Sequence, residues 1–245
     1  MTDTAATATD VTVPTDTGDV PIRLWLPPAG DGPGIVLLQE IFGVSAYVRR
    51  RAADLAALGY VVAAPEIFWR LGVTEPVEGT DGTDALQEGM SLAQRLDWQQ
   101  AVLDAAATVE WLRDRDEVTG GVGVVGFCFG GGLGFNVAAH LESEGATPVD
   151  ALVSYYGSAL PGLHDVMAVA APSLHHFGLA DSFIDTDTVR RIEASLEKEP
   201  QTVVVTYPGA DHAFDNPDMP WFHAGASGEA WARTEEFLGE QLPTP

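Results

Sequence analysis

Short, continuous runs of apolar residues recur along this chain and are separated by longer stretches in which apolar and polar residues mix. Such runs are typical of strands that are buried on both faces of a parallel sheet. They predict central strands over Gly34–Gln39, Tyr60–Ala64, Val122–Phe127, Ala151–Tyr156, Ser173–Gly178 and Gln201–Tyr207. Ahead of them, alternation over Val11–Val13 and Pro21–Leu26 predicts two strands around the turn Thr15–Asp19.

The stretches between these runs have the composition and the end signals of helices. We expect helices over about Ala46–Leu58, Ala85–Asp114 with one break, Gly131–Leu141, Thr186–Glu199 and Ser227–Leu238. Strands that alternate with helices require a mostly parallel, doubly wound sheet with helices on both faces, here with an antiparallel start. The sequence therefore predicts an α/β fold.

No linker, internal repeat or change of composition divides the chain, so residues 11–245 are expected to form a single domain. Residues 1–10 are rich in Thr, Ala and Asp and are expected to be disordered. Residues 66–84 are irregular and rich in Gly, Thr, Glu and Asp. A loop of that length in a compact domain is usually a lid, a binding loop or disordered.

The charge balance narrows the choice of partners. The chain carries 36 acidic residues against 12 Lys and Arg, a formal net charge of −24, which repels nucleic acids and anionic membranes. Lys198 is the sole lysine, so the acidic balance fits either adaptation to high salt or an arginine-biased genome. The absence of a membrane-length apolar run or a signal-peptide pattern, together with a single cysteine, favours the cytoplasm.

The segment Gly126-Phe127-Cys128-Phe129-Gly130 follows the predicted strand Val122–Phe127 and precedes a predicted helix. A nucleophile-type residue between glycines at a strand–turn–helix junction is the pattern of a nucleophile elbow, with cysteine in place of serine. The glycines allow close approach of strand and helix, and the helix N-terminus favours a thiolate. Taken alone, the pentapeptide also fits a packed core thiol or a phosphate-binding turn.

Two later residues bear on this choice, because catalytic groups gather at the carboxyl ends of parallel strands. Asp181 follows the strand Ser173–Gly178, and His212 follows the strand Gln201–Tyr207. The order Cys128, Asp181, His212 is the nucleophile–acid–histidine order of α/β-hydrolases. Asp211 is a rival for the acid. The remaining histidines form no metal-ligand pattern, so neither a metal nor a cofactor is expected.

These motifs together resemble the dienelactone hydrolase family of α/β-hydrolases. The resemblance is carried by Gln39-Glu40-Ile41-Phe42-Gly43, Ala64-Pro65-Glu66-Ile67-Phe68, the elbow, Tyr155-Tyr156-Gly157, Gly178-Leu179-Ala180-Asp181 and Tyr207-Pro208-Gly209-Ala210-Asp211-His212-Ala213-Phe214. It implies a single-domain α/β-hydrolase fold in which Cys128 is the nucleophile and Asp181 and His212 are its partners. It further implies Glu40 as a carboxylate that helps control ionisation of the thiol, and an oxyanion hole from the backbone N–H groups of Ile41 and Phe129. The implied substrate pocket is lined by Phe42, Tyr155 and Phe183.

The chain departs from this family at the substrate carboxylate. Dienelactone hydrolases proper hold that group with two arginines, one of which lies four residues beyond the catalytic histidine. Asn216 occupies this position, and the other arginine aligns near Leu86. Arg70 and Arg95 are the candidates to substitute for them. The sequence thus looks more like relatives of broader substrate range.

The resulting prediction is a carboxylic ester hydrolase of the carboxymethylenebutenolidase type that cleaves a small ester or lactone through an acyl-cysteine. A monomer or a small homo-oligomer is expected. Two other functions stay open from the residues: a non-catalytic member that binds a small molecule or a partner, and a redox-sensing thiol. The redox function is the less supported, because no second cysteine is present to resolve a sulfenic acid.

Overall fold

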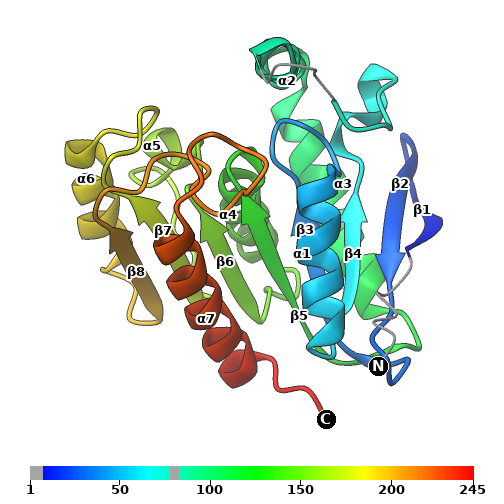
Figure 1. Ribbon diagram of the computed structural model, residues 1–245. Coiled ribbons are helices and arrows are strands. Elements are labelled where there is room, and N and C mark those ends of the chain that lie inside the picture. Colours follow the sequence, from blue (N-terminus) through cyan, green and yellow to red (C-terminus); the bar gives the residue numbers. More distant parts are fainter. Residues whose placement is uncertain (1–7, 78–82) are drawn as a thin grey trace, which may run out of the picture.

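A computed structural model describes residues 8–77 and 83–245, and its centre is an eight-stranded sheet (Figure 1). The strands lie in the order β1-β2-β4-β3-β5-β6-β7-β8. Pairing is antiparallel between β1 and β2 and between β2 and β4, and parallel elsewhere. The strands are β1 (Thr9–Thr15), β2 (Gly18–Trp25), β3 (Gly32–Leu38), β4 (Val61–Pro65), β5 (Val118–Phe127), β6 (Ala151–Tyr155), β7 (Ser173–Gly178) and β8 (Thr202–Tyr207).

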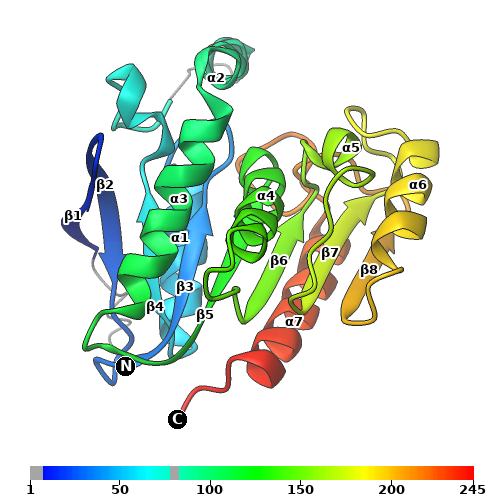
Figure 2. The same ribbon diagram turned by 180° about the vertical axis from the view of Figure 1, so that it is seen from behind.

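Helices cover both faces of this sheet. Helices α1 and α7 lie on the face turned toward the viewer in Figure 1, and α3 and α4 lie on the opposite face, seen in Figure 2. Every residue of β3, β4, β6 and β7 is buried between these layers, as continuous apolar runs require. The helical elements are α1 (Ala46–Ala57), η1 (Ile67–Leu71), α2 (Thr83–Arg95), α3 (Trp98–Arg113), α4 (Phe129–Ser143), α5 (Leu160–Leu163), α6 (Thr186–Leu196) and α7 (Ala224–Gln241).

The predicted α/β fold is therefore confirmed, including its antiparallel start and its two helical layers. The expectation of disorder over residues 1–10 lies mostly outside the described residues, but Thr9 and Asp10 already pair with β2 in β1 and correct it there. The stretch 66–84 is not irregular throughout either. The 3-10 helix η1 occupies its start and α2 begins at Thr83, while residues 78–82 lie outside the described part.

The chain leaves the carboxyl ends of four strands at one edge of the sheet. Glu40 follows β3, Cys128 follows β5, Asp181 follows β7 and His212 follows β8. Helix α2 lies beyond this same edge, at the top of Figure 1. Within the described chain, no helix is both long and apolar enough to cross a bilayer.

Candidate active site

Cys128 lies at a strained turn between β5 and α4. Its backbone has φ 53° and ψ −112°, and it is the N-cap residue of α4. Such a conformation is uncommon for a residue with a side chain. The flanking glycines are required by close contact, because a Cβ at Gly126 would lie 2.1 Å from the carbonyl oxygen of Gly130, and one at Gly130 would lie 2.3 Å from that of Leu38. The turn therefore presents the thiol at the edge of the sheet, with α4 beginning at Phe129 and not at Gly131 as expected.

Three side chains from separate loops form a line of hydrogen bonds at this edge. The Sγ atom of Cys128 lies 3.0 Å from Nε2 of His212, and Nδ1 of the same ring lies 2.8 Å from Oδ2 of Asp181. All three side chains are buried. The second oxygen of Asp181 accepts the backbone N–H groups of Phe183 and Ile184 at 2.7 and 2.8 Å, which fixes the carboxylate toward the histidine.

Burial and charge act in opposite directions on His212. Burial lowers the pKa of its imidazole, but the neighbouring Cys128 and Asp181 favour the charged form, and the net effect raises this pKa well above its ordinary value. The rival acid is placed elsewhere. Oδ1 of Asp211 accepts the backbone N–H groups of Ser182 and His212, each at 2.7 Å. Asp211 therefore shapes the two loops, while Asp181 orients the ring.

Glu40 is a buried carboxyl group beside this line. Its Oε2 atom accepts a hydrogen bond from Nδ2 of Asn216 at 2.8 Å, and its Oε1 atom lies 3.5 Å from the hydroxyl of Tyr156. Burial raises the pKa of Glu40 to about 7, although Asn216 and the charge of His212 favour ionisation. A group with this pKa can gain or lose a proton near neutral pH.

The backbone amides predicted for an oxyanion hole come from the loop after β3 and from the start of α4. Phe129 is the first residue of α4, where an N–H group has no partner within the helix. The close approach of Gly130 to the end of β3 brings this helix start against the loop that contains Ile41. On its other side, Ile41 is packed under α2, because a Cβ at Gly89 would lie 2.7 Å from its carbonyl oxygen.

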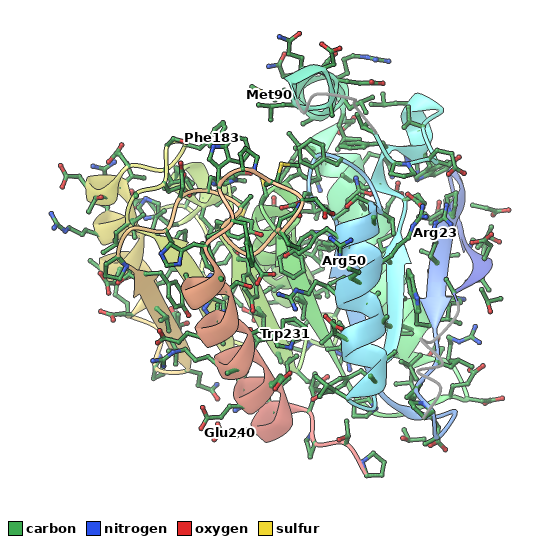
Figure 3. The ribbon with its side chains drawn as sticks, viewed as in Figure 1. Arg23, Arg50, Met90, Phe183, Trp231 and Glu240 are labelled. Carbon is green, nitrogen blue, oxygen red and sulfur yellow. The ribbon has the colours of Figure 1, made fainter. Side chains whose placement is uncertain are left out.

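The three predicted pocket aromatics have different surroundings. Phe183 is 53 % exposed, and its ring lies 4.9 Å from that of His212. Phe183 and Met90 of α2 are both labelled in Figure 3, near the carboxyl ends of the strands. Phe42 is buried in the loop after β3. Tyr155 does not line this edge: it is fully buried and its hydroxyl lies 2.7 Å from that of Thr234 in α7. Successive residues of a strand point to opposite faces, and Tyr155 points into the core under α7.

Neither substitute arginine is placed with the cluster. Arg70 forms hydrogen bonds of 2.8 and 2.7 Å to the carboxylate of Asp104 and lies over the ring of Trp69. Arg95 is exposed in the last turn of α2. The position four residues beyond His212 holds the neutral amide of Asn216, which is engaged by Glu40.

Three polar residues of this region were not singled out from the sequence. Tyr156 has a positive φ of 38°, and its ring lies 5.1 Å from that of His212. Its hydroxyl lies 3.4 Å from the hydroxyl of Tyr47, which in turn donates to Asp215 at 2.5 Å. Tyr156 could have been found from the sequence. Because successive residues of a strand point to opposite faces, Tyr156 was the alternative to Tyr155 at this edge. Among the described residues, no cluster of His, Cys, Asp and Glu is arranged to hold a metal ion.

The strand order, the elbow and the strand-end histidine define the class of this protein as an α/β-hydrolase. The sequence model of the dienelactone hydrolase family matches residues 22–242, so the chain belongs to this family. The resemblance drawn from the motifs is thereby confirmed, and the protein is a hydrolase that resembles dienelactone hydrolase. A carboxymethylenebutenolidase of Pseudomonas sp. is 34 % identical over 224 residues, covering 90 % of each chain. The carboxymethylenebutenolidase of Pseudomonas putida is 33 % identical over 215 residues, covering 86 % of this chain and 87 % of that protein.

Solved structures agree with this assignment. A structure from Klebsiella pneumoniae that is assigned to the dienelactone hydrolases superposes with a TM-score of 0.79 at 26 % identity, covering 96 % of this chain and 99 % of that one. A dienelactone hydrolase-like promiscuous phosphotriesterase from metagenomic libraries gives a TM-score of 0.75 at 22 % identity, over 97 % and 99 % of the chains. At that identity, the second comparison supports the fold alone.

Proposed function

We propose that this protein hydrolyses a small ester or lactone through an acyl-cysteine formed on Cys128. The observation that carries the proposal is the line of hydrogen bonds from Sγ of Cys128 to Nε2 of His212 and from Nδ1 of His212 to Asp181, at 3.0 and 2.8 Å. A nucleophile within hydrogen-bond reach of a base that a third group orients is the arrangement of nucleophilic acyl transfer.

In the first half-reaction the Cys128 thiol passes its proton to His212 and the sulfur attacks the acyl carbon. The carbonyl oxygen becomes an oxyanion, which the N–H groups of Ile41 and Phe129 would stabilise. The C–O bond to the leaving group then breaks, and the leaving oxygen takes the proton from Nε2 of His212. Asp181 stabilises the imidazolium while that proton resides on the ring. For a lactone, the leaving alcohol stays attached to the acyl group.

In the second half-reaction a water molecule attacks the thioester carbon. His212 accepts a proton from this water and returns it to the sulfur as the C–S bond breaks, so that a carboxylic acid leaves and the free thiol is restored. Glu40 acts beside these steps as a carboxyl group that exchanges a proton near neutral pH, because burial raises its pKa to about 7. Its charge in turn affects how readily the nearby thiol ionises.

The surroundings of the site favour a neutral substrate. Carboxymethylenebutenolidase is the activity in the names of the related Pseudomonas proteins, which supports a lactone or enol ester as the reacting group. A substrate carboxylate, however, would meet Asn216 where an arginine is needed, and Arg70 is held by Asp104. The exposed ring of Phe183 and the half-buried ring of Trp221, whose centroids lie 6.4 Å apart, favour an apolar substituent next to the ester.

Acyl transfer to the single cysteine is tested with p-nitrophenyl acetate. Wild type should release p-nitrophenol in a burst followed by steady turnover, and intact-mass measurement at early times should show one acetyl adduct. The variant Cys128→Ala and the iodoacetamide-treated protein should lose both signals. Alkylation is specific here because Cys128 is the sole cysteine of the chain. Unchanged turnover after complete alkylation would refute the acyl-cysteine. The absence of turnover and of an adduct with every ester tested would favour a non-catalytic protein that binds a small molecule or a partner.

A further inference from the structure

A row of buried oxygen atoms leads from Glu40 into the interior. Oε1 of Glu40 lies 3.5 Å from the hydroxyl of Tyr156, this hydroxyl lies 3.4 Å from that of Tyr47, and Tyr47 lies 2.5 Å from Oδ2 of Asp215. Glu40 comes from the loop after β3, Tyr156 from the residue after β6, Tyr47 from helix α1 and Asp215 from the loop before α7. All four are buried, so their hydrogen bonds are made with one another and not with bulk water.

The direction of these hydrogen bonds is fixed at the Asp215 end. Asp215 is in an ion pair with Arg51 at 2.6 Å and also accepts the hydroxyl of Ser227 at 2.7 Å. A carboxylate can only accept, so Tyr47 must give its one hydroxyl proton to Asp215. Toward Tyr156, the oxygen of Tyr47 is therefore an acceptor and nothing else.

The other oxygen of Glu40 is fixed as well. The backbone N–H of Asp218 donates to Oδ1 of Asn216 at 3.0 Å, which turns the Nδ2 group of this amide toward Oε2 of Glu40. An amide nitrogen can only donate, so Oε2 stays an acceptor in both protonation states. If Glu40 carries a proton, that proton is on Oε1, facing Tyr156.

The single proton of Tyr156 then has two acceptors, Oε1 of Glu40 and the oxygen of Tyr47. When Glu40 is ionised, Tyr156 donates to it. When Oε1 is protonated, Glu40 donates to Tyr156, and the Tyr156 proton turns to Tyr47. In both states each hydroxyl proton, and the carboxyl proton when it is present, has an oxygen acceptor, so no buried donor is left unpaired. We propose that Tyr156 and Tyr47 are positioning residues whose hydroxyl groups reorient so that Glu40 can be held either with or without a proton.

The titratable and charged groups near Glu40 lie on two sides of it. They are the possible imidazolium of His212 and the thiol of Cys128 on one side, and the pair Asp215–Arg51 on the other, with the neutral hydroxyls of Tyr156 and Tyr47 between. The positive His212 favours ionisation of Glu40 and Asp215 opposes it. The consequence for turnover rests on the proposed function, whereas the reorientation of hydroxyl groups is a property of the resting protein.

The test follows the carboxyl group itself. Infrared difference spectra recorded as pH is changed report the C=O stretch of a protonated carboxyl, and the band that disappears in Glu40→Gln belongs to Glu40. Tyr156→Phe removes the donor to ionised Glu40, so the titration midpoint should move upward. Tyr47→Phe removes the alternative acceptor, so Tyr156 keeps donating to Glu40 and the midpoint should move downward. Each shift should exceed about 0.3 pH units, the equivalent of roughly 0.4 kcal/mol.

Tyr155→Phe is the matched control. It removes a buried hydroxyl one residue away that bonds to Thr234 and not to Glu40, so its midpoint should equal that of wild type. Opposite shifts in Tyr156→Phe and Tyr47→Phe support the proposal, and shifts of equal sign or no shifts overturn it. If Tyr156→Phe does not fold, the shift of Tyr47→Phe decides alone, since only a downward one agrees. Opposite infrared shifts with no ester turnover would refute the proposed function and keep the hydroxyl arrangement.

Discussion

The imidazole of His212 is held by a different group at each of its nitrogen atoms. Nε2 faces the thiol of Cys128 and Nδ1 faces Asp181, while Asp211 binds the backbone of the same residue. The ring transfers a proton in both halves of the proposed reaction, and Asp181 only orients it and stabilises its charge. The two residues should therefore differ in what their loss costs.

We expect His212→Ala to lower kcat/KM by about 10²–10⁴-fold, the usual contribution of a positioned general base. Asp181→Asn should cost less, and Asp211→Asn, which keeps an oxygen that can accept the same two backbone N–H groups, less still. Single-turnover acylation with p-nitrophenyl acetate measures all three variants. A loss in Asp211→Asn as large as that in Asp181→Asn would show that the acid is wrongly assigned.

Burial of Glu40 has a cost that depends on pH. In the unfolded chain the carboxyl ionises near its ordinary pKa of 4.5, and in the folded protein the pKa is about 7. Between these values the unfolded state releases its proton first, so the free energy of unfolding falls as pH rises, by up to about 3 kcal/mol above pH 7. Glutamine can keep the bonds to Asn216 and Tyr156 without the charge.

Glu40→Gln should thus be more stable than wild type, with a small difference at pH 5 and the largest at pH 8. Urea unfolding at pH 5, 6.5 and 8 measures this difference above the isoelectric region, which lies near pH 4.2. Glu240→Gln is the control, because Glu240 is exposed on α7, where Figure 3 labels it. The difference in free energy of unfolding between this variant and wild type should not vary with pH. A pH-independent difference for Glu40→Gln would contradict the raised pKa.

For single residues, the sequence predicts which of them lie at strand ends, but it does not predict the direction of every side chain. The sequence predicts Cys128, Asp181 and His212 together because the ends of parallel strands share one edge of the sheet, and their side chains do lie within hydrogen-bond distance there. The prediction for Tyr155 was wrong because its side chain points from the strand into the core, where its hydroxyl lies 2.7 Å from that of Thr234.

Among the elements outside the triad, α2 packs directly against the loop that contains Ile41 of the proposed oxyanion hole. Gly89 lies on the buried side of α2, where a Cβ would come within 2.7 Å of the Ile41 carbonyl and 3.1 Å of its side chain. The next residue, Met90, is exposed. The position of α2 is therefore coupled to the loop that presents the Ile41 amide, even though the helix supplies no group to the triad.

Gly89→Ala should move α2 or the Ile41 loop by several tenths of an ångström. We expect kcat to fall about 10-fold with thermal stability lowered by about 1–3 kcal/mol, the usual cost of overpacking. Gly228→Ala is the matched control on α7, where a Cβ meets nothing within 4 Å. It should stabilise the protein by about 0.5–1 kcal/mol and leave kcat unchanged. Wild-type kcat in Gly89→Ala would show that α2 does not position the loop.

The elements themselves were predictable to different degrees. Central strands were found because apolar runs bounded by turn residues have few other interpretations. The helices α2 and α3 correspond to the predicted helical stretch Ala85–Asp114 with its one break, whereas the first two residues of α4 and the 3-10 helix η1 were not predicted. The start of α4 lies at a contact between distant segments, because Gly130 packs against the carbonyl oxygens of Leu38 and Gln39. Such contacts between distant segments cannot be read from a local pattern.

The whole molecule carries a net charge of −24, and this field acts on any charged substrate before it reaches Cys128. A negative surface lowers the local concentration of anions and slows their encounter, most strongly at low ionic strength. At the site, a buried substrate carboxylate near Asn216 and Glu40 would have no arginine partner. Its uncompensated desolvation would cost on the order of several kcal/mol. Both effects disfavour an anionic substrate, but only the first is screened by salt.

A dienelactone and its methyl ester, assayed at low and high ionic strength, separate these two effects. The methyl ester should have the higher kcat/KM under both conditions. High salt should raise kcat/KM of the free acid and so reduce the difference in kcat/KM between the two substrates. The difference that remains at high salt should come from the site. Asn216→Arg adds a cation beside Glu40 and should narrow this remaining part, whereas Arg95→Ala, on the exposed end of α2, should not change it. The preference for a neutral substrate would be contradicted if the free acid had the higher kcat/KM. If Arg70→Ala or Arg95→Ala then abolished that preference, the arginine concerned would contact the substrate carboxylate.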